Sequence, residues 1–419
     1  MKNTNPQPPF PRRRPSNAIS NISSANQEQE LDLICFSHLR WDFVYQRPQH
    51  LMGRCAKQRR VIFWEEPVPV MAGKEELVLS QRQDHLTVAT PHVSSEWTPD
   101  EINSVQREML DCLMLERNIQ RHVSWYYTPM ALNFSDHLQP LATVYDCMDE
   151  LSAFKGASPL LRVMENNLFR LADLVFTGGQ SLYEAKRPQH HSVHPFPSSI
   201  DAGHFGRARQ VVQDPEDQAS IPSPRMGFFG VLDERLDLEL LRGIATARPD
   251  WHFVMIGPVV KIDDAELPRA ANIHYLGPKS YDQLPDYLAG WDVALILFAK
   301  NESTRFISPT KTPEYLAAGK PVVSTSIHDV VHPYCDAGLV RIADSVEDFT
   351  GAINQSLEAV PPGWLHSIDQ FLSGNSWDST WQRMWGLVTK RLERLQEPFT
   401  GKDQLELAVT SMNPRSPNV

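Results

Sequence analysis

The stretch SPTKTPEYLAAGKPVVST, residues 308 to 325, carries a turn, a helix and a buried strand in direct succession. Ser308 and Pro309 open the turn, EYLAAG has helical character, and Gly319 is a residue type that commonly ends helices. Pro321 then leads into an apolar run rich in valine. The sequence therefore predicts a short helix whose N-terminus lies between Thr310 and Glu314.

The start of this helix is suited to an anion. Free backbone N–H groups and the positive end of the helix dipole favour a diphosphate there, and Lys311 adds a full charge. Glu314 lies one turn into the helix and can accept hydrogen bonds from two ribose hydroxyls. The same glutamate can instead complement the helix dipole, and spacing alone leaves both roles open.

Short apolar runs alternate with helical patterns along the whole chain, which is typical of parallel α/β architecture. The expected strands form two series. The first series is 31 to 36, 59 to 64, 122 to 127, 142 to 146 and 173 to 178, and the second is 225 to 230, 252 to 257, 272 to 277, 292 to 298 and 321 to 325. Two similar α/β halves follow from this pattern.

The stretch between the two series is rich in Pro, Ser and charge and lacks a long apolar period, as expected of a linker. Two late helices are expected, and the second carries an apolar stripe with three tryptophans, for which core packing is favoured over sugar stacking. We predict a disordered tail (1–29), an N-terminal Rossmann-like domain (30–195), a hinge (196–222), a C-terminal Rossmann-like domain (223–360), C-terminal helices (361–396) and a second disordered tail (397–419).

Composition narrows the class of protein. The chain has 419 residues, of which 41% are hydrophobic and 22% charged, and no apolar run is long enough to span a membrane. A formal net charge of -11 argues against a nucleic-acid partner. The 5 cysteines are scattered without the spacing of a zinc site. We expect a cytoplasmic protein without a structural metal.

The 308–325 run resembles the nucleotide-sugar loop and helix of the retaining GT-B glycosyltransferases of family four. HPFPSSIDAGHF (194 to 205) is similar to the hinge motif of that family, and NIHYLGPKSYDQLPDYLAGWDVALILF (272 to 298) to its base-binding region. SHLRWDFVYQRPQHLMGRCA (37 to 56) and VYDCMDELSAF (144 to 154) resemble a bacterial subgroup associated with exopolysaccharide and cell-wall polymers. The resemblance implies two Rossmann-like domains facing across a cleft, with no metal or other cofactor. It also implies a set of donor-binding residues, which are Gly230, Arg235, Gly257, Gly277, Tyr281, Leu284, Phe306, Ile307, Ser308, Pro309, Thr310, Lys311 and Glu314.

The chain departs from that family at two places. The family usually has a Glu-x7-Glu motif, but Phe306 stands where the first glutamate would precede Glu314, so the backbone N–H groups of Phe306 to Ser308 are the expected replacement. The usual Arg and Lys pair after the first strand of the second domain is also missing. Arg235 is the candidate for the second phosphate cation, or else a solvated arginine paired with Asp233 or Glu239.

Two segments of the first half are expected at the cleft because the carboxyl ends of parallel strands carry ligand sites. The loop and helix start after the first strand contribute Arg40, Trp41, Arg47 and His50 on the acceptor side. A later strand end contributes Asp146, Asp149 and Glu150, which can orient an acceptor hydroxyl, take its proton, or cap the next helix.

These features predict a glycosyltransferase that uses a UDP-sugar, or a GDP-sugar as the less favoured donor, and a hydroxyl of a glycan or lipid-linked acceptor. The predicted catalytic residues are Asp146, Asp149, Arg235 and Lys311. Retention of anomeric configuration and peripheral contact with the inner membrane face follow from the resemblance alone. A nucleotide-sugar epimerase and a non-catalytic subunit of a polysaccharide assembly stay open as alternatives.

Overall fold

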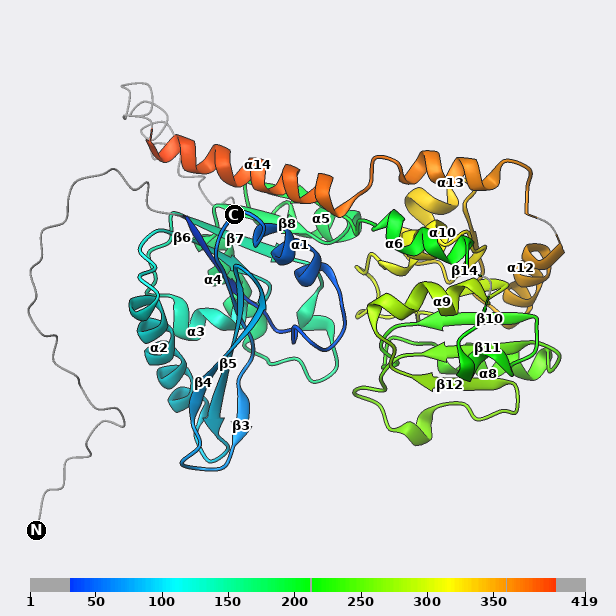
Figure 1. Ribbon diagram of the computed structural model, residues 1–419, viewed down its shortest axis with the longest axis horizontal. Helices are drawn as coiled ribbons and strands as arrows, with labels where there is room; N and C mark the ends of the chain where they lie inside the picture. The colour runs from blue at the N-terminus through cyan, green and yellow to red at the C-terminus, as the bar shows by residue number, and fades with distance from the viewer. Residues whose placement is uncertain (1–30, 212, 359, 397–419) are drawn as a thin grey trace, which may run out of the picture.

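The computed structural model describes residues 31–211, 213–358 and 360–396, and the two predicted tails lie outside the described residues. The chain forms two α/β domains, one blue to teal and the other green to yellow in Figure 1. Within the described residues no helix combines the length and the apolar character needed to cross a membrane.

The N-terminal domain is built on a nine-stranded sheet with the order β3-β5-β2-β1-β6-β7-β8-β9, and β4 pairs antiparallel to β5. Its strands are β1 (Asp32–Phe36), β2 (Val61–Trp64), β3 (Val68–Val70), β4 (Glu76–Gln83), β5 (Leu86–Ser94), β6 (His122–Tyr126), β7 (Ala142–Cys147), β8 (Leu174–Thr177) and β9 (Val193–Pro195). Its helices are α1 (Arg47–Cys55), α2 (Pro99–Glu116), η1 (Pro129–Ala131), α3 (Leu132–Ser135), η2 (Leu151–Ala153), α4 (Leu161–Leu171) and α5 (Gln180–Lys186). The five expected strands of this half are confirmed, and β3, β4, β5 and β9 were not expected.

The C-terminal domain has a six-stranded parallel sheet with the order β12-β11-β10-β13-β14-β15. Its strands are β10 (Arg225–Phe229), β11 (His252–Ile256), β12 (Ile273–Gly277), β13 (Val293–Ile296), β14 (Val322–Ser324) and β15 (Val340–Ile342). Its helices are α6 (Ala202–Gly206), η3 (Arg207–Arg209), α7 (Glu216–Ala219), α8 (Leu238–Ala247), η4 (Asp264–Glu266), η5 (Tyr281–Gln283), α9 (Leu284–Ala289), α10 (Lys311–Ala317), α11 (His328–Val330), η6 (Val331–Cys335), α12 (Val346–Glu358) and α13 (Trp364–Leu372). The second strand series is confirmed, with β15 added.

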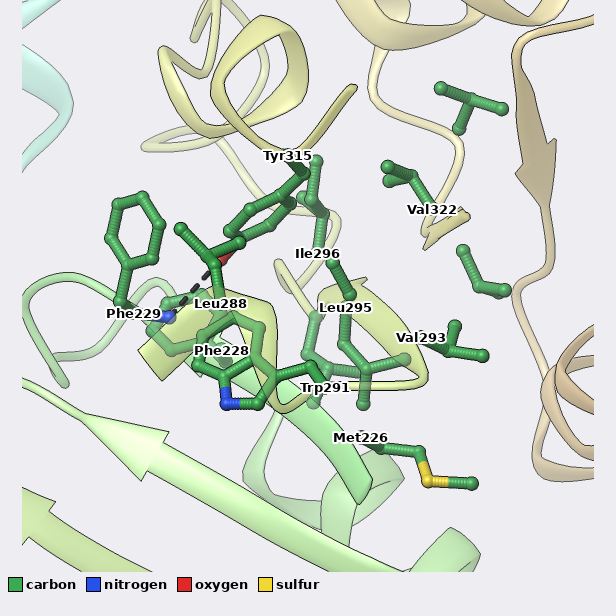
Figure 2. Packing of buried hydrophobic residues seen from close by; sticks show 14 of the residues in the cluster. Met226, Phe228, Phe229, Leu288, Trp291, Val293, Leu295, Ile296, Tyr315 and Val322 are labelled. Carbon is green, nitrogen blue, oxygen red and sulfur yellow. Dashed lines mark hydrogen bonds between the residues drawn. The ribbon is translucent and has the colours of Figure 1, made fainter. Parts of the chain in front are cut away.

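The core of this domain fixes α10 beside β10 (Figure 2). The Phe229 N–H at the end of β10 donates a hydrogen bond of 3.1 Å to the hydroxyl of Tyr315, which is fully buried on α10. Gly227 lies against Trp291, and a β-carbon there would be 1.8 Å from the indole ring. The predicted end of the helix is also found, since Gly319 follows α10 with φ +75, a conformation that glycine adopts readily. These contacts set where the first turn of α10 lies.

The chain passes between the domains twice, and the two passages touch. Ile200 and Ser376 form a parallel bridge, and the Ser199 and Thr380 hydroxyls are 2.6 Å apart. Part of the predicted hinge packs on the C-terminal domain, since Phe205, Ala208 and Ile221 belong to the core of that domain.

The last helix returns to the N-terminal domain. α14 (Trp377–Gln396), orange to red in Figure 1, lies along that domain. Trp377, Trp381, Met384 and Val388 are buried in one cluster with Trp125 of β6. The prediction that this apolar stripe packs in a core is therefore confirmed, and the core is that of the other domain.

Candidate active site

A cavity of about 380 Å³ lies between the two domains. Its N-terminal wall is the loop that leads from β1 into α1, and its C-terminal wall is made of the turns after β10, β11 and β12 and the first turn of α10. Its lining residues are Trp41, Asp42, Phe43, Val44, Tyr45, Gln46, Phe229, Gly230, Val231, Arg235, Ile256, Gly257, Pro258, Pro278, Lys279, Ser280, Tyr281, Leu284, Thr310, Lys311 and Glu314. We call it the large cavity.

A second cavity of about 90 Å³ shares four of these lining residues, which are Gln46, Arg235, Thr310 and Lys311. The other residues that line it are Arg47, Met148, Asp149, Gly178, Ser198, Phe298, Ile307, Ser308 and Pro309. We call it the small cavity. Because the shared residues include two cations and the start of α10, the junction of the cavities is the place that suits an anion.

Lys311 is the first residue of α10 and lines both cavities. Its ammonium group lies 5.4 Å from the ring centres of Phe228 and Phe298 and makes no hydrogen bond or ion pair with any residue that the structure describes. Burial lowers the pKa of Lys311 to about 8. Gly230, which has φ +135, leaves room for this side chain, since a β-carbon there would be 2.6 Å from the Lys311 Nζ atom.

Glu314 lies in the first turn of α10 and is 6% exposed. Its Oε2 atom is buried and has no hydrogen-bond partner among the described residues. Burial raises the pKa of Glu314 to about 7, and the charge of Lys311 opposes that rise. Because a buried polar atom without a partner is costly, this carboxylate is placed to receive a donor from a ligand.

Arg235 follows β10 and lines both cavities. Its guanidinium is paired with Asp233, with a distance of 2.6 Å from Nη2 to Oδ2, and the ring of Phe154 from the N-terminal domain lies 5.5 Å from its Cζ atom. Arg235 therefore forms the ion pair with Asp233 that was considered as an alternative, and it also lines the wall of both cavities. Glu239, the other partner considered, pairs with Arg242.

Close backbone approaches shape the turns of the C-terminal wall. Gly257 has φ +143, and a β-carbon on it would be 1.8 Å from the Gly230 carbonyl oxygen. Gly277 does not line either cavity, but its carbonyl accepts a hydrogen bond of 3.0 Å from the Gly257 N–H. Tyr281 and Leu284, which the resemblance gives as donor-binding residues, line the large cavity.

The segment before α10 is divided between the small cavity and the protein interior. Phe306, at the position of the missing glutamate, lines neither cavity and packs against the core of the N-terminal domain. Ile307 and Ser308 line the small cavity, and the Ser308 carbonyl accepts a hydrogen bond of 2.9 Å from the Ser198 hydroxyl. The Ile307 N–H donates a hydrogen bond of 3.3 Å to the Thr304 carbonyl. The Ser308 N–H makes no hydrogen bond to any described residue, so it is the one of these two amides that a ligand can use.

The predicted acceptor-side residues separate into two groups. Trp41 lines the large cavity, and its backbone N–H donates to Glu65 at 2.7 Å. Arg47 lines the small cavity, and so does Asp149, whose pKa is raised by burial with the charge of Arg235 opposing.

The other four predicted residues line neither cavity and have protein partners. Arg40 pairs with Glu65 at 3.2 Å, and Glu150 pairs with Lys186 at 2.7 Å. His50 stacks on Trp377 with ring centres 4.4 Å apart, and Asp146 is fully buried against Arg47 at 2.8 Å. Asp146 therefore holds Arg47 and does not face either cavity.

Sequence reasoning missed several lining residues, above all Tyr45, Gln46 and Lys279. Gln46 had a signal, because it stands immediately before an Arg-Pro pair that starts a helix. The side-chain amide of Gln49 holds this loop by donating to the carbonyls of Trp41 and Val44 at 2.8 and 3.0 Å. Among the described residues no three His, Cys, Asp or Glu side chains gather as a metal site would.

Two Rossmann-like domains with a cavity between the carboxyl ends of their sheets define the GT-B fold. Solved structures confirm this fold. Sucrose-phosphate synthase from Thermosynechococcus elongatus matches with a TM-score of 0.63 and 12% identity, over 86% of this chain and 98% of that one. A trehalose-6-phosphate protein from E. coli bound with UDP-2-fluoro glucose matches with a TM-score of 0.63 and 11% identity, over 86% and 99%. HepE from Anabaena, in complex with UDP and glucose, matches with a TM-score of 0.61 and 12% identity, over 86% and 99%.

In addition to the shared fold, sequence comparison finds relatives of the C-terminal domain. Residues 223–359 match the family described as glycosyl transferases group 1. A Bacillus subtilis (strain 168) protein, TuaH, whose name assigns it to teichuronic acid biosynthesis as a glycosyltransferase, is 25% identical over 229 residues. That similarity spans 50% of this chain and 57% of TuaH.

Proposed function

We propose that this protein is a glycosyltransferase that moves a sugar from a nucleotide-diphosphate sugar to a hydroxyl of a glycan or lipid-linked acceptor. The observation that carries the proposal is the start of α10, where an ammonium and a buried carboxylate oxygen line one cavity between two domains and neither has a partner among the residues that the structure describes. A nucleoside diphosphate offers the matching groups, since its phosphates need cations and its ribose hydroxyls need an acceptor.

The two cavities suggest how the donor lies. The large cavity would hold the nucleoside, with Glu314 on the ribose, and the small cavity would hold the sugar. The diphosphate would then lie at their junction beside Lys311 and Arg235. As the glycosidic bond to the diphosphate breaks, negative charge grows on the leaving group, and fixed cations there stabilise the transition state.

Asp149 and the Ser308 amide are the proposed groups around the transferred sugar. Asp149 can orient an acceptor hydroxyl or take its proton, because it lines the small cavity and its carboxylate makes no hydrogen bond to any described residue. For Asp146 we propose a supporting role through Arg47.

Retention of anomeric configuration and independence from a divalent cation are proposed from the family resemblance. Removal of metal ions with EDTA should leave the transfer rate unchanged. A rate that EDTA abolishes and an added divalent cation restores would contradict the proposed independence.

A UDP-sugar is the favoured donor, with a GDP-sugar as the second choice. Two structures of the same fold contain UDP or a UDP-sugar analogue, which supports this order. The name of TuaH supports an acceptor that belongs to a cell-envelope polymer. We accordingly propose that the protein works on the cytoplasmic side of the inner membrane, in peripheral contact with it.

The test is a turnover assay with a panel of UDP-sugars and GDP-sugars, each with and without glycan and lipid-linked acceptors. We expect acceptor-dependent release of the nucleoside diphosphate that Lys311→Ala and Glu314→Gln abolish. Arg242→Ala is the control, since its side chain is 51% exposed and, among the described residues, forms an ion pair only with Glu239. Conversion of the donor sugar without any acceptor would indicate an epimerase, and no turnover of any donor would indicate a non-catalytic subunit.

A further inference from the structure

The wall of the large cavity carries a second buried polar atom that has no partner in the described part of the chain. The Tyr281 hydroxyl, like the Glu314 Oε2 atom, is buried and makes no hydrogen bond to any residue that the structure describes. Both residues line the same cavity, and they come from different elements, η5 and α10. Folding leaves buried polar atoms unpaired only rarely, so two such atoms at one cavity indicate a ligand that pairs with both.

The ring of Tyr281 is held in place from both domains. His204 of α6 stacks on it with ring centres 4.1 Å apart and planes inclined by 6°. Tyr45, from the N-terminal loop, also stacks on it at 4.6 Å and 28°, and Phe205 meets it edge-on at 5.5 Å. A ring fixed by three neighbours presents its hydroxyl in one place, which lowers the entropy cost of binding a ligand.

The chemistry of the two groups is complementary. A carboxylate oxygen only accepts hydrogen bonds, whereas a phenol hydroxyl can donate one and accept others. Burial, and next the charge of Glu314, raise the pKa of Tyr281, so its hydroxyl keeps its proton. A pair of neighbouring hydroxyl groups on one sugar ring can donate to the carboxylate and accept from the phenol at the same time.

We infer that Tyr281 and Glu314 together bind the two ribose hydroxyls of the donor nucleotide, so that the site selects ribonucleotides over deoxyribonucleotides. Tyr45 makes this selection a property of both domains, because it packs on Tyr281 from across the cavity. The inference rests on the proposed function, since it concerns how that nucleotide is recognised.

The experiment is calorimetric titration of the full chain with whichever of UDP or GDP binds, and with its 2′-deoxy and 3′-deoxy analogues. We expect the wild-type protein to prefer the ribonucleotide to at least one analogue by about tenfold, the equivalent of one good hydrogen bond. Tyr281→Phe keeps the stacked ring but removes the hydroxyl. We expect this variant to bind the ribonucleotide more weakly and to show a clearly smaller preference, because Glu314 alone then distinguishes the sugars.

Tyr287→Phe is the matched control. The Tyr287 hydroxyl donates to Asp217 at 2.7 Å and lines neither the large nor the small cavity, so the preference should stay at its wild-type value. An unchanged preference in Tyr281→Phe, or equal wild-type affinity for all three nucleotides, would overturn the inference and leave the proposed function standing. Absence of any nucleotide binding by the wild-type protein would overturn the proposed function itself.

Discussion

Replacement of Asp146 by asparagine should destabilise the N-terminal domain strongly. The Asp146 carboxylate is 0% exposed and the Arg47 guanidinium 3% exposed, with 2.8 Å between Nη2 and Oδ1. Asparagine preserves the shape but removes the charge, so the Arg47 cation is left buried without its counter-ion. Breaking a buried pair in this way costs about 3–5 kcal/mol, which is a shift of roughly two to three and a half powers of ten in the folding equilibrium.

The same helix provides a matched control at its other end. Arg54, in the last turn of α1, pairs with Asp378, which is 62% exposed, at 3.0 Å. Asp378→Asn should cost at most about 1 kcal/mol because water screens the pair. Urea unfolding followed by tryptophan fluorescence measures both variants. Equal costs for the two variants would refute the conclusion that Asp146 is a structural partner of Arg47.

Three further predictions concern the site and the return of α14. Gly230→Ala should weaken nucleotide binding by at least about tenfold, because its β-carbon would be 2.4 Å from the Lys311 Cε atom, whereas Gly351→Ala, with nothing within 4 Å, should bind normally in the same titration. Affinity for a nucleotide sugar, measured as a function of pH, should be highest near neutrality. Above the lowered Lys311 pKa of about 8 the ammonium loses its charge, and below the raised Glu314 pKa of about 7 the carboxylate gains a proton. An affinity that does not change with pH would count against both roles. Met384→Ala, at a side chain that is 0% exposed, should cost about 2–5 kcal/mol in thermal or urea unfolding, and a loss under 1 kcal/mol would show that α14 does not depend on this contact.

Much of the fold could be predicted because the central strands of parallel sheets are buried on both faces and read as continuous apolar runs. VIFW of β2 and VALI of β13 are examples. β4, ELVLSQRQ, escaped prediction because it is an exposed antiparallel strand with polar residues on it. β15 is only three residues long and has no such pattern.

The candidate site was predictable where local signals specify it. The turn residues before α10 and the glycine after it located Lys311 and Glu314 without any knowledge of distant contacts. Local signals did not show which of Asp146 and Asp149 lines a cavity. β7 extends to Cys147, so Asp146 is still inside a buried strand while Asp149 lies beyond its end, and two residues of strand length decide which carboxylate reaches a cavity.

Contacts between distant segments could not be predicted from the sequence. The apolar stripe of α14 predicted burial, but only the folded chain shows that Trp381 packs on Trp125 of β6 and Trp377 on His50 of α1. Tyr45 reaches the cavity because Gln49 holds its loop and because the other domain brings Tyr281 opposite it. Both are consequences of how the two domains meet.

The most direct test of the account is calorimetric titration of UDP, GDP and their sugar conjugates into the wild-type protein and into Lys311→Ala and Glu314→Ala. We predict that one nucleotide series binds the wild-type protein and that both variants lose most of this affinity while they unfold in urea as the wild-type protein does. Failure of every nucleotide to bind, or undiminished binding by both variants, would contradict the central claim that the start of α10 holds the donor.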